Sequence, residues 1–430
     1  MSKIAVVGTG YVGLATGAYL SHLGHKVVCA DVVPEKVERL SRAEIPIVEP
    51  GLEELVKEGL TNQNLSFVLG AENAAKGADF VFLCVPTPQG EDGSADLSYV
   101  QQAAREIAPV LDSDTIVINK STVPVGSTRV VESAMQRPDV FVVSNPEFLR
   151  EGSAVNDCLN PDRIVIGADS QPAAARVAEL FAKLNAPVVI TDPASAETIK
   201  YAANAFLATK ISFVNAMANL CEAVGADIRE VTLGMGYDKR IGFEFLKPGP
   251  GWGGSCFPKD SRALVRIGED AGYDFSLLRG VIEVNNEQYA AVANKIRNAA
   301  GGTLEGKTVG VWGLTFKANT DDLRDSPSLY VIDRLVEMGA TVKGYDITQL
   351  RTHRLHHPTL DKIELCNDAY AAVDGADVVA VLTEWDEFRW VDFAKVKESM
   401  TNPAIVDARN LLDGPPLRNL GFKYMAIGRS

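Results

Sequence analysis

The chain has 430 residues and a formal net charge of −14 at pH 7, which predicts two or three domains and argues against a nucleic-acid or anionic-membrane surface. Its hydrophobic content of 46% and charged content of 23% are typical of a soluble globular protein, and no apolar run reaches membrane-spanning length without a polar interruption. The six cysteines include no Cys-x-x-Cys pair, which argues against a disulfide framework or a zinc site and favours a reducing cytoplasm.

The first predicted elements are a strand, a glycine turn and a helix. An apolar run begins at the third residue, which leaves no room for a signal peptide, and it stops at Gly8-Thr9-Gly10-Tyr11-Val12-Gly13. A helical pattern follows to about residue 24, and a second predicted strand, 27–30, ends at Asp31. This order is typical of an NAD site, in which the glycines admit the pyrophosphate and the acidic residue accepts the ribose hydroxyls. Asp31 would repel the 2′-phosphate of NADP, although Lys36 weakens that preference, and a generic βαβ turn is the alternative.

Polar side chains follow two later strands. Predicted strands at 80–85, 115–119 and 140–144 alternate with helices, which indicates a parallel doubly wound sheet. Thr122 follows the second of these strands, and Glu147 and Glu151 follow the third. We expect these side chains at the carboxyl edge of the sheet, where ligands bind in such folds, with turn or helix-cap roles as the alternative.

One long, mostly apolar helix is predicted over 198–225. Lys200 and Asn204 are four residues apart, so both project from one face of this helix. A solvated polar stripe is the alternative, but the neighbouring apolar residues leave little solvent face. The helix is too hydrophobic for a surface element, and we expect it to pack in the core of a symmetric dimer.

The stretch Gly251-Trp252-Gly253-Gly254-Ser255-Cys256-Phe257-Pro258-Lys259-Asp260 holds a cysteine on a glycine-built loop beside two charges. If a helix begins near Ser255, Cys256 lies in its first turn, where the pKa of a thiol falls, and Asp260 lies on the same face. A buried structural cysteine is the alternative. Because no Tyr-x-x-x-Lys motif is present and the five histidines lie away from these motifs, we expect the chemistry to depend on cysteine, lysine, carboxylate, threonine and asparagine side chains.

From about residue 307 the chain repeats the strand pattern of its beginning. Gly313 matches the first glycine of the turn, but Leu314, Phe316 and Lys317 follow it where the first copy has further glycines. The repeat therefore predicts a second α/β domain that does not hold a pyrophosphate as the first does, and Lys317 is available for another phosphate or hydroxyl. We expect domains at 1–193, 194–301 and 302–430, with the ligand in a cleft between the two sheet domains.

Six motifs together closely resemble the nucleotide-sugar 6-dehydrogenases, the UDP-glucose/GDP-mannose dehydrogenase family. They are the glycine turn, Glu49-Pro50-Gly51-Leu52, Lys120-Ser121-Thr122-Val123-Pro124, Asn145-Pro146-Glu147-Phe148, Ala202-Ala203-Asn204-Ala205-Phe206 and the cysteine stretch. The resemblance implies two Rossmann-like parallel-sheet domains joined by a long central helix. It also implies a two-step, NAD-dependent oxidation of a primary alcohol to a carboxylate, in which the cysteine forms a thiohemiacetal and then a thioester.

The resemblance also implies roles for individual residues. The implied catalytic residues are Cys256, Lys200, Asn204, Asp260, Glu147 and Thr122. The implied NAD contacts are Gly8, Gly10, Tyr11, Val12, Gly13, Asp31, Lys36, Thr87, Thr122, Glu151, Lys259 and Arg324. The implied substrate contacts are Glu147, Phe148, Leu149, Glu151, Lys200, Asn204, Phe245, Lys247, Gly253, Cys256, Phe316, Lys317, Arg409 and Arg240, the last offered across a dimer interface. No metal is implied.

The substrate implied is UDP-glucose, and the product UDP-glucuronate. GDP-mannose and a UDP-N-acetylhexosamine are alternatives, although the enzymes for the latter tend to lack the Phe-Pro-Lys-Asp sequence that follows Cys256 here. A non-catalytic NAD-binding regulator is a further alternative, and it predicts loss of the polar set that this chain retains. The resemblance implies a homodimer or higher homo-oligomer that binds neither nucleic acid nor membrane.

Overall fold

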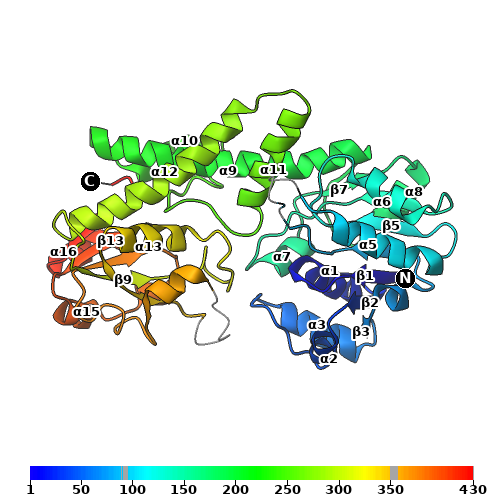
Figure 1. The fold of residues 1–430 in the computed structure, drawn as a ribbon, viewed down its shortest axis with the longest axis horizontal. Coiled ribbons are helices and arrows are strands. Elements are labelled where there is room, and N and C mark those ends of the chain that lie inside the picture. The colour runs from blue at the N-terminus through cyan, green and yellow to red at the C-terminus, as the bar shows by residue number, and fades with distance from the viewer. Residues whose placement is uncertain (89, 91–94, 349–356, 430) are drawn as a thin grey trace. The chain divides into compact units, whose positions relative to one another are not determined.

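The computed structural model describes residues 1–88, 90, 95–348 and 357–429. These form two compact units, Met1–Ala203 with Arg262–Ala271, and Asn204–Ser261 with Gly272–Ser430. Two helices, α9 (Pro193–Val224) and α11 (Phe257–Asp270), each begin in one unit and end in the other. Figure 1 shows the first unit mainly in blue and cyan and the second mainly in green to red. The predicted long helix is confirmed, and it begins five residues earlier than the sequence pattern indicated.

The first unit is built on one eight-stranded sheet in the order β3-β2-β1-β4-β5-β6-β7-β8. Its strands are β1 (Lys3–Val7), β2 (Lys26–Asp31), β3 (Leu65–Leu69), β4 (Phe80–Leu83), β5 (Ile116–Asn119), β6 (Phe141–Ser144), β7 (Ile164–Gly167) and β8 (Val188–Thr191). All neighbours are parallel except β6 and β7. The parallel sheet is as predicted, whereas the antiparallel β6–β7 step was not foreseen.

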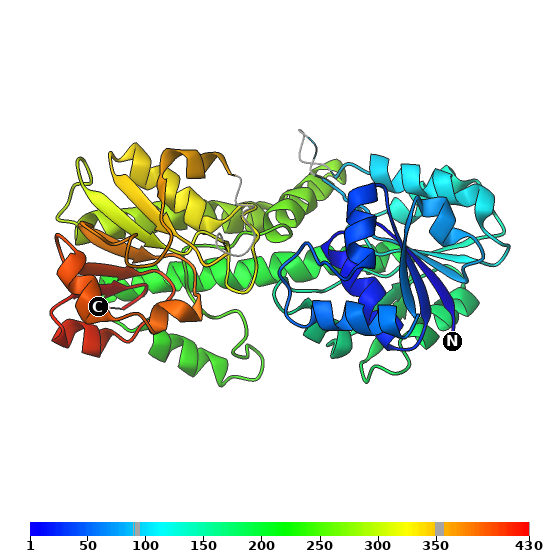
Figure 2. The ribbon, with the colours of Figure 1, turned by 90° about the horizontal axis from the view of Figure 1, so that it is seen from below.

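Helices cover both faces of this sheet (Figure 2). Along β1, Ile4 and Val6 belong to one hydrophobic core while Ala5 and Val7 belong to another, as expected for a strand buried on both faces. The helices are α1 (Tyr11–His22), α2 (Pro34–Ser41), α3 (Leu52–Thr61), α4 (Ala71–Ala75), α5 (Ser98–Ile107), α6 (Ser127–Met135), α7 (Ala154–Leu159) and α8 (Gln171–Leu180), with the 3₁₀ turn η1 (Ala108–Val110). Because these strands are parallel, the carboxyl ends of β1, β4, β5 and β6 lie at one edge of the sheet.

The second unit repeats the arrangement with six parallel strands in the order β11-β10-β9-β12-β13-β14. They are β9 (Thr308–Trp312), β10 (Thr341–Tyr345), β11 (Glu364–Leu365), β12 (Val378–Val381), β13 (Ala404–Asp407) and β14 (Lys423–Ala426). The order matches β3-β2-β1-β4-β5-β6 of the first unit strand for strand. The internal repeat predicted from the sequence is therefore a repeat of topology.

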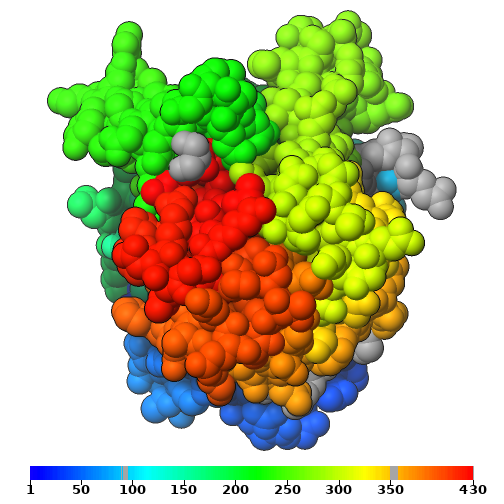
Figure 3. Space-filling view, turned by 90° about the vertical axis from the view of Figure 1, so that its left-hand side faces the viewer, coloured from blue at the N-terminus to red at the C-terminus, as the bar shows by residue number. Residues whose placement is uncertain are grey.

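Helices of the second unit pack on its sheet and on the part of α9 that follows Ala203. They are α10 (Ile228–Gly236), α12 (Ser276–Ala299), α13 (Pro327–Glu337), α15 (Phe393–Ser399) and α16 (Gly414–Asn419), with the 3₁₀ turns η2 (Pro358–Lys362) and η3 (Asp386–Arg389). Val214 and Ala218 of α9 share a core with Val292 and Ile296 of α12 and with strand β9. In Figure 3 the green residues, which include the end of α9 and α10, project above the red C-terminal segment.

Candidate active site

The glycine turn between β1 and α1 has the shape that a dinucleotide requires. Gly8 has a φ of 94°, and a Cβ there would lie 2.7 Å from the Cys84 carbonyl oxygen. A Cβ on Gly13 would lie 1.8 Å from the Gly8 carbonyl oxygen, so α1 can approach the turn closely only because Gly13 has no side chain. A Cβ on Gly10, in contrast, would meet nothing within 4 Å. The backbone at Gly10 therefore faces open space where a pyrophosphate can approach.

Asp31 lies at the end of β2, beside this turn. Its carboxylate accepts hydrogen bonds from the Thr9 N–H at 3.1 Å and from the Lys36 ammonium at 2.7 Å. Burial alone would raise the pKa of Asp31, but the hydrogen bonds from Lys36 and Thr9 outweigh burial and hold the pKa below its ordinary value. Asp31 is therefore ionised at neutral pH and acts only as an acceptor.

The loops after β4 and β5 are joined by hydrogen bonds. The Thr87 hydroxyl donates to the Thr122 carbonyl oxygen at 2.9 Å, and the Ser121 hydroxyl donates to the Val85 carbonyl oxygen at 2.7 Å. Thr87 and Thr122 are thus brought together at the carboxyl edge of the first sheet.

A buried ion pair joins α9 to the loop after β6. Lys200 Nζ lies 2.8 Å from Glu147 Oε1, and both side chains are at most 5% exposed. Burial alone would raise the pKa of Glu147, but Lys200 outweighs it and holds the pKa below its ordinary value. The Leu149 N–H donates to the second oxygen of Glu147 at 2.7 Å, and the Phe148 ring lies under Lys200 and Arg163. The carboxylate is therefore charged and fixed in direction.

The loop before the cysteine belongs to the second unit, and buried polar side chains hold its backbone. Asn285 of α12 accepts from the Trp252 N–H at 2.8 Å and donates to the Trp252 carbonyl oxygen at 3.0 Å. Asn215 of α9 accepts from the Gly249 N–H at 2.8 Å. A Cβ on Gly253 would lie 1.9 Å from the Asp325 carbonyl oxygen. The glycines are thus required because the loop packs directly against other backbone.

Cys256 immediately precedes α11, which begins at Phe257, two residues later than expected. The Asp260 N–H donates to the Cys256 carbonyl oxygen at 2.8 Å, which is the first bond of the helix. The expectation that Cys256 lies inside the first turn is therefore corrected to a position at its edge, because Gly254, with a φ of 83°, delays the helical conformation. Cys256 is half-buried, whereas the other five cysteines are buried. Burial raises the pKa of Cys84 and of Cys158 to about 12.

Asp260 projects toward α9 from the first turn of α11. The Asn204 side-chain amide donates to Asp260 Oδ2 at 2.6 Å, and Lys259 Nζ lies 3.0 Å from Oδ1. Asn204 and Asp260 are both buried. Asn204 thus follows Lys200 by one turn of α9, and the two contact different carboxylates, one in the loop after β6 and one in α11.

Arg409 follows β13 and reaches two loops of the second unit. Its guanidinium donates to the Phe316 carbonyl oxygen at 2.9 Å and lies 3.0 Å from Glu384 Oε2. A Cβ on Gly249 would lie 3.2 Å from the Arg409 guanidinium. Lys317 Nζ lies 5.2 Å from the centre of the Phe316 ring. Arg409, Phe316, Lys317 and the loop before Cys256 are thus neighbours.

Four further residues of the second unit lie around the same loop or beyond it. The Arg324 carbonyl oxygen accepts from the Gly254 N–H at 3.0 Å, and the Arg324 guanidinium pairs with Asp322. The Phe245 ring lies 6.3 Å from that of Phe257, and Lys247 is exposed. Arg240 is 89% exposed and pairs with Asp238 only two residues away. Arg240 and Lys247 are thus both exposed, whereas Phe245 is half-buried.

Sequence profiles of one family match along the chain. Residues 2–185 match the NAD-binding domain, 194–287 the central domain and 310–414 the UDP-binding domain of the UDP-glucose/GDP-mannose dehydrogenase family. The chain belongs to this family. The resemblance drawn from the six motifs and the expected NAD cofactor are both confirmed, and the chain is an NAD-dependent dehydrogenase.

Full-length relatives and a solved structure agree with this assignment. The chain is 45% identical to "UDP-glucose 6-dehydrogenase TuaD" of Bacillus subtilis, over all of the chain and 94% of the relative. It is 44% identical to "UDP-glucose 6-dehydrogenase" of Pseudomonas aeruginosa, over 99% of the chain and 97% of the relative. The structure of a UDP-glucose dehydrogenase from Pyrobaculum islandicum superposes with a TM-score of 0.91 at 37% identity, covering all of the chain and 98% of that protein.

Several buried polar contacts of this dehydrogenase were not foreseen from the sequence. Lys120 donates to Asn145 at 3.0 Å beneath the Glu147 loop, and Glu197 of α9 accepts from the Gly126 and Thr128 N–H groups at the start of α6. Lys120 and Asn145 lie in motifs that the resemblance quoted, so their position at strand ends was an available signal. No local pattern marks Glu197.

Among residues 1–88, 90, 95–348 and 357–429, no helix is long and apolar enough to cross a membrane.

Proposed function

We propose that this enzyme oxidises UDP-glucose to UDP-glucuronate in two NAD-dependent steps, with Cys256 carrying the intermediate. The full-length similarity to enzymes named UDP-glucose 6-dehydrogenase carries the choice of substrate. The contrast between half-buried Cys256 and five buried cysteines supports the choice of nucleophile, since a thiol must be reachable to react.

In the first step the C6 hydroxyl loses a proton and its carbon loses a hydride, which NAD⁺ accepts when bound. We assign the developing oxygen charge to Lys200 and Asn204, because an ammonium and an amide N–H are both donors. We assign the proton to Asp260, which Asn204 already contacts. Lys200 can remain charged although buried because Glu147 balances it at 2.8 Å.

In the second step the Cys256 sulfur adds to the aldehyde carbon, and the carbonyl oxygen takes up a proton. The resulting thiohemiacetal has a hydride to lose from C6, whereas a free aldehyde has no such tetrahedral carbon. Loss of that hydride, which a second NAD⁺ accepts when bound, and of the hydroxyl proton gives a thioester. Water then breaks the carbon–sulfur bond, releases the acid and returns the thiol, and we assign the placement of this water to Thr122 and Glu147.

The remaining residues are proposed to bind the two ligands. For NAD these are Gly8, Gly10, Tyr11, Val12, Gly13, Asp31, Lys36, Thr87, Thr122, Glu151, Lys259 and Arg324. For the nucleotide sugar they are Phe148, Leu149, Glu151, Phe245, Lys247, Gly253, Phe316, Lys317 and Arg409, with Arg240 from a second copy. We retain the division into 1–193, 194–301 and 302–430 and a cytoplasmic location as proposals.

The stoichiometry of reduced cofactor tests the reaction. The purified enzyme is offered NAD⁺ with UDP-glucose, GDP-mannose or UDP-N-acetylglucosamine in turn. Taking a primary alcohol to a carboxylate removes four electrons, so we expect two NADH for each UDP-glucose consumed, no aldehyde in solution and little turnover of the other two sugars. One NADH for each sugar, with aldehyde accumulating, contradicts the covalent mechanism. Preferential turnover of GDP-mannose contradicts the substrate.

We further propose that the second half of α9 packs against a second copy of the chain. Phe206, Phe213 and Leu220 lie seven residues apart and are 65%, 51% and 50% exposed. The intervening positions of the same stripe, 209, 216 and 223, hold a threonine and two alanines. An exposed apolar stripe with a repeat of seven is typical of helix-to-helix association, and cyclic dimers are the commonest oligomers.

Light scattering of paired variants tests this dimer. Phe213→Glu places a charge in the middle of the stripe, so we expect a monomer of half the wild-type mass. Trp390→Glu is the matched control, because Trp390 is 83% exposed but lies outside α9. A wild-type protein that is monomeric and fully active, or a Phe213→Glu variant that remains dimeric, contradicts the proposal.

A further inference from the structure

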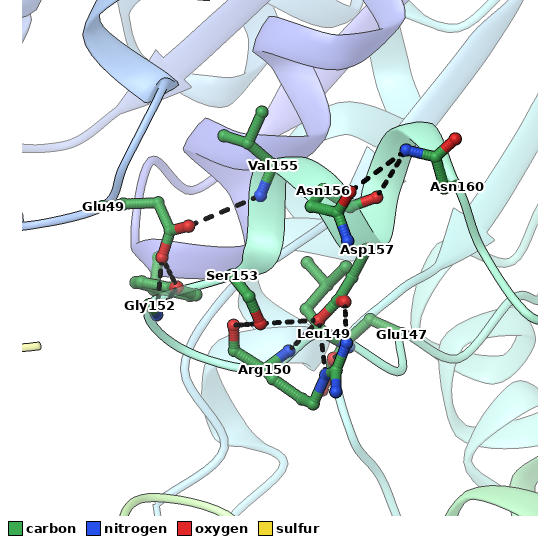
Figure 4. Close-up of polar contacts among 11 residues, drawn as sticks. Glu49, Glu147, Leu149, Arg150, Gly152, Ser153, Val155, Asn156, Asp157 and Asn160 are labelled. Carbon is green, nitrogen blue, oxygen red and sulfur yellow. Dashed lines mark hydrogen bonds and ion pairs between the residues drawn. The ribbon is translucent and has the colours of Figure 1, made fainter. Parts of the chain in front are cut away.

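Glu49 has no part in the chemistry proposed above, yet it is buried and hydrogen-bonded to backbone far away in the sequence. Its Oε2 accepts from the Gly152 N–H at 2.7 Å, and its Oε1 accepts from the Val155 N–H at 3.5 Å (Figure 4). Gly152 lies between β6 and α7 and directly follows Glu151. A carboxylate from the segment before α3 thus holds the backbone of the loop that carries Glu147 and Glu151.

Tyr11 connects the same carboxylate to the glycine turn. The Tyr11 hydroxyl donates to Glu49 Oε2 and accepts from the Gly152 N–H at 2.9 Å. Burial and then Glu49 raise the pKa of Tyr11 far above its ordinary value, so the hydroxyl keeps the proton that it donates. Since Tyr11 is the first residue of α1 and follows Gly10, the Tyr11–Glu49 pair joins the dinucleotide turn to the loop after β6.

The other side of Glu151 is held as well. The Arg150 N–H donates to Asp157 Oδ2 at 2.9 Å, and the Arg150 guanidinium donates to both oxygens of the same carboxylate. Gly152 has a φ of 81°, a conformation that side-chain-bearing residues rarely adopt. Figure 4 shows Arg150 bonded to the carboxylate of Asp157 and Gly152 bonded to that of Glu49. In the sequence Glu151 lies between these two residues, so the backbone on both of its sides is held.

We propose that Glu49 is a positioning residue that fixes Glu151 relative to the glycine turn. Through Tyr11 and Gly152 it holds the turn that binds NAD and the loop of carboxylates in one geometry, and it transfers neither a proton nor a hydride itself. Binding of NAD⁺ at the turn then orders the loop, and by reciprocity an ordered loop favours NAD⁺ binding. The kinetic test of this proposal rests on the proposed oxidation of UDP-glucose, whereas the hydrogen-exchange test does not.

Hydrogen exchange with NAD⁺ tests the coupling without any sugar. Glu49→Gln keeps the shape of the side chain but turns an NH₂ toward one of the two backbone N–H donors, and Tyr11→Phe removes only the hydroxyl. Glu53→Gln is the matched control, because Glu53 is exposed on α3 and pairs with Lys57. We expect the Gly152 amide to exchange about tenfold faster in both variants and at the wild-type rate in the control. We also expect NAD⁺ to slow this exchange in the wild type and to have much less effect in Tyr11→Phe. Equal exchange at Gly152 in all four proteins overturns the proposal.

Kinetics separate positioning from a purely structural role. The turnover rate is divided by the measured concentration of NAD⁺-binding sites, so that unfolded protein is not counted. We then expect Glu49→Gln to lower kcat about tenfold while KM for UDP-glucose changes by less than about twofold. The pH at which activity changes is expected to stay the same, since Glu49 moves no proton. Variants that lose thermal stability but keep the wild-type kcat for each site overturn the proposal. If the wild type does not oxidise UDP-glucose, the proposed function fails and the exchange experiment alone decides this inference.

Discussion

The two units share a strand order but differ in the turn after their first strand. In the first unit, the position of Gly10 faces open space, and the Asp31 side chain beside the turn is 10% exposed. In the second unit, Gly313 matches Gly8, the residue at the Gly10 position is Thr315, and both Thr315 and Asp346, which occupies the position of Asp31, are fully buried. The Asp346 carboxylate accepts from the Leu314 and Thr315 N–H groups at 2.7 and 3.0 Å. The protein thus fills its second turn with its own backbone and side chains.

The difference shows that strand order alone does not make a dinucleotide site. An acidic residue at the end of the second strand can accept ribose hydroxyls only if a ligand can reach it. Both aspartates accept hydrogen bonds within their own turn, but Asp31 keeps an exposed side next to open space, whereas Asp346 is fully buried and is part of the core.

Removing the Cys256 thiol, which lies in the second unit, is expected to abolish formation of UDP-glucuronate. The glycine turn of the first unit should remain intact. Cys256→Ala cannot form a thiohemiacetal, so we expect UDP-glucuronate formation to fall by about 10³-fold or more. Binding of NAD⁺, measured by calorimetry, is expected to be unchanged. Cys221→Ala is the control for loss of a sulfur from the same unit, because Cys221 is buried in the core formed with α12. Near-normal acid formation by Cys256→Ala contradicts the mechanism.

Alanine variants of the two aspartates are expected to affect different properties: cofactor binding for Asp31 and stability for Asp346. Asp31→Ala loses ribose acceptors beside the glycine turn, so we expect NAD⁺ affinity to fall roughly tenfold, the preference over NADP⁺ to narrow and the melting temperature to fall less than in Asp346→Ala. Asp346→Ala leaves buried backbone donors unsatisfied, which costs about 1–3 kcal/mol in the free energy of unfolding. Its NAD⁺ preference is expected to match the wild type. If Asp346→Ala changed the cofactor preference and Asp31→Ala did not, the contrast between the two turns would be wrong.

The charge on Asp31 is expected to give a small, pH-dependent contribution to stability. Folding lowers the pKa of Asp31, so the ionised form is favoured in the folded state, and the stabilisation is present above the ordinary aspartate pKa of about 4. It is lost as pH falls through the lower folded pKa. Urea unfolding should therefore give the wild type a higher free energy of unfolding than Asp31→Asn at pH 7, and this difference should disappear in acid. The difference for Glu53→Gln, which removes an exposed charge, is expected to be near zero throughout.

Local patterns were sufficient to predict the elements that carry the site. The glycine turn, the strand ending at Asp31 and the cysteine loop each have a signature within a few residues, because turn geometry and strand periodicity are local properties. The start of α11 was predicted two residues early, since Gly254 adopts a left-handed φ that the sequence does not reveal. Neither the antiparallel β6–β7 step nor β8 had a pattern that we recognised.

Polar contacts between distant segments could not be predicted from the sequence. Asn285 holds the backbone of Trp252 from 33 residues away, and Glu49 reaches Gly152 across 103 residues. The local sequence around an asparagine on an amphipathic helix is the same whether its side chain is solvated or hydrogen-bonds to the backbone of another loop. Lys200 and Asn204 could be singled out because their spacing on an apolar helix is unusual, and both are buried. Nothing local indicated that their partners would be Glu147 and Asp260.

The burial of five cysteines gives the protein a single site for thiol reagents. All six cysteines lie among the described residues, and a thiol whose pKa is raised to about 12, like that of Cys84, is thiolate in only about one molecule in 10⁵ at neutral pH. Alkylation of the folded enzyme by iodoacetamide should therefore add one carbamidomethyl group, at Cys256. A fluorophore or spin label can thus be attached at this position without removing any native cysteine, and mild oxidants would act on the enzyme through this one sulfur.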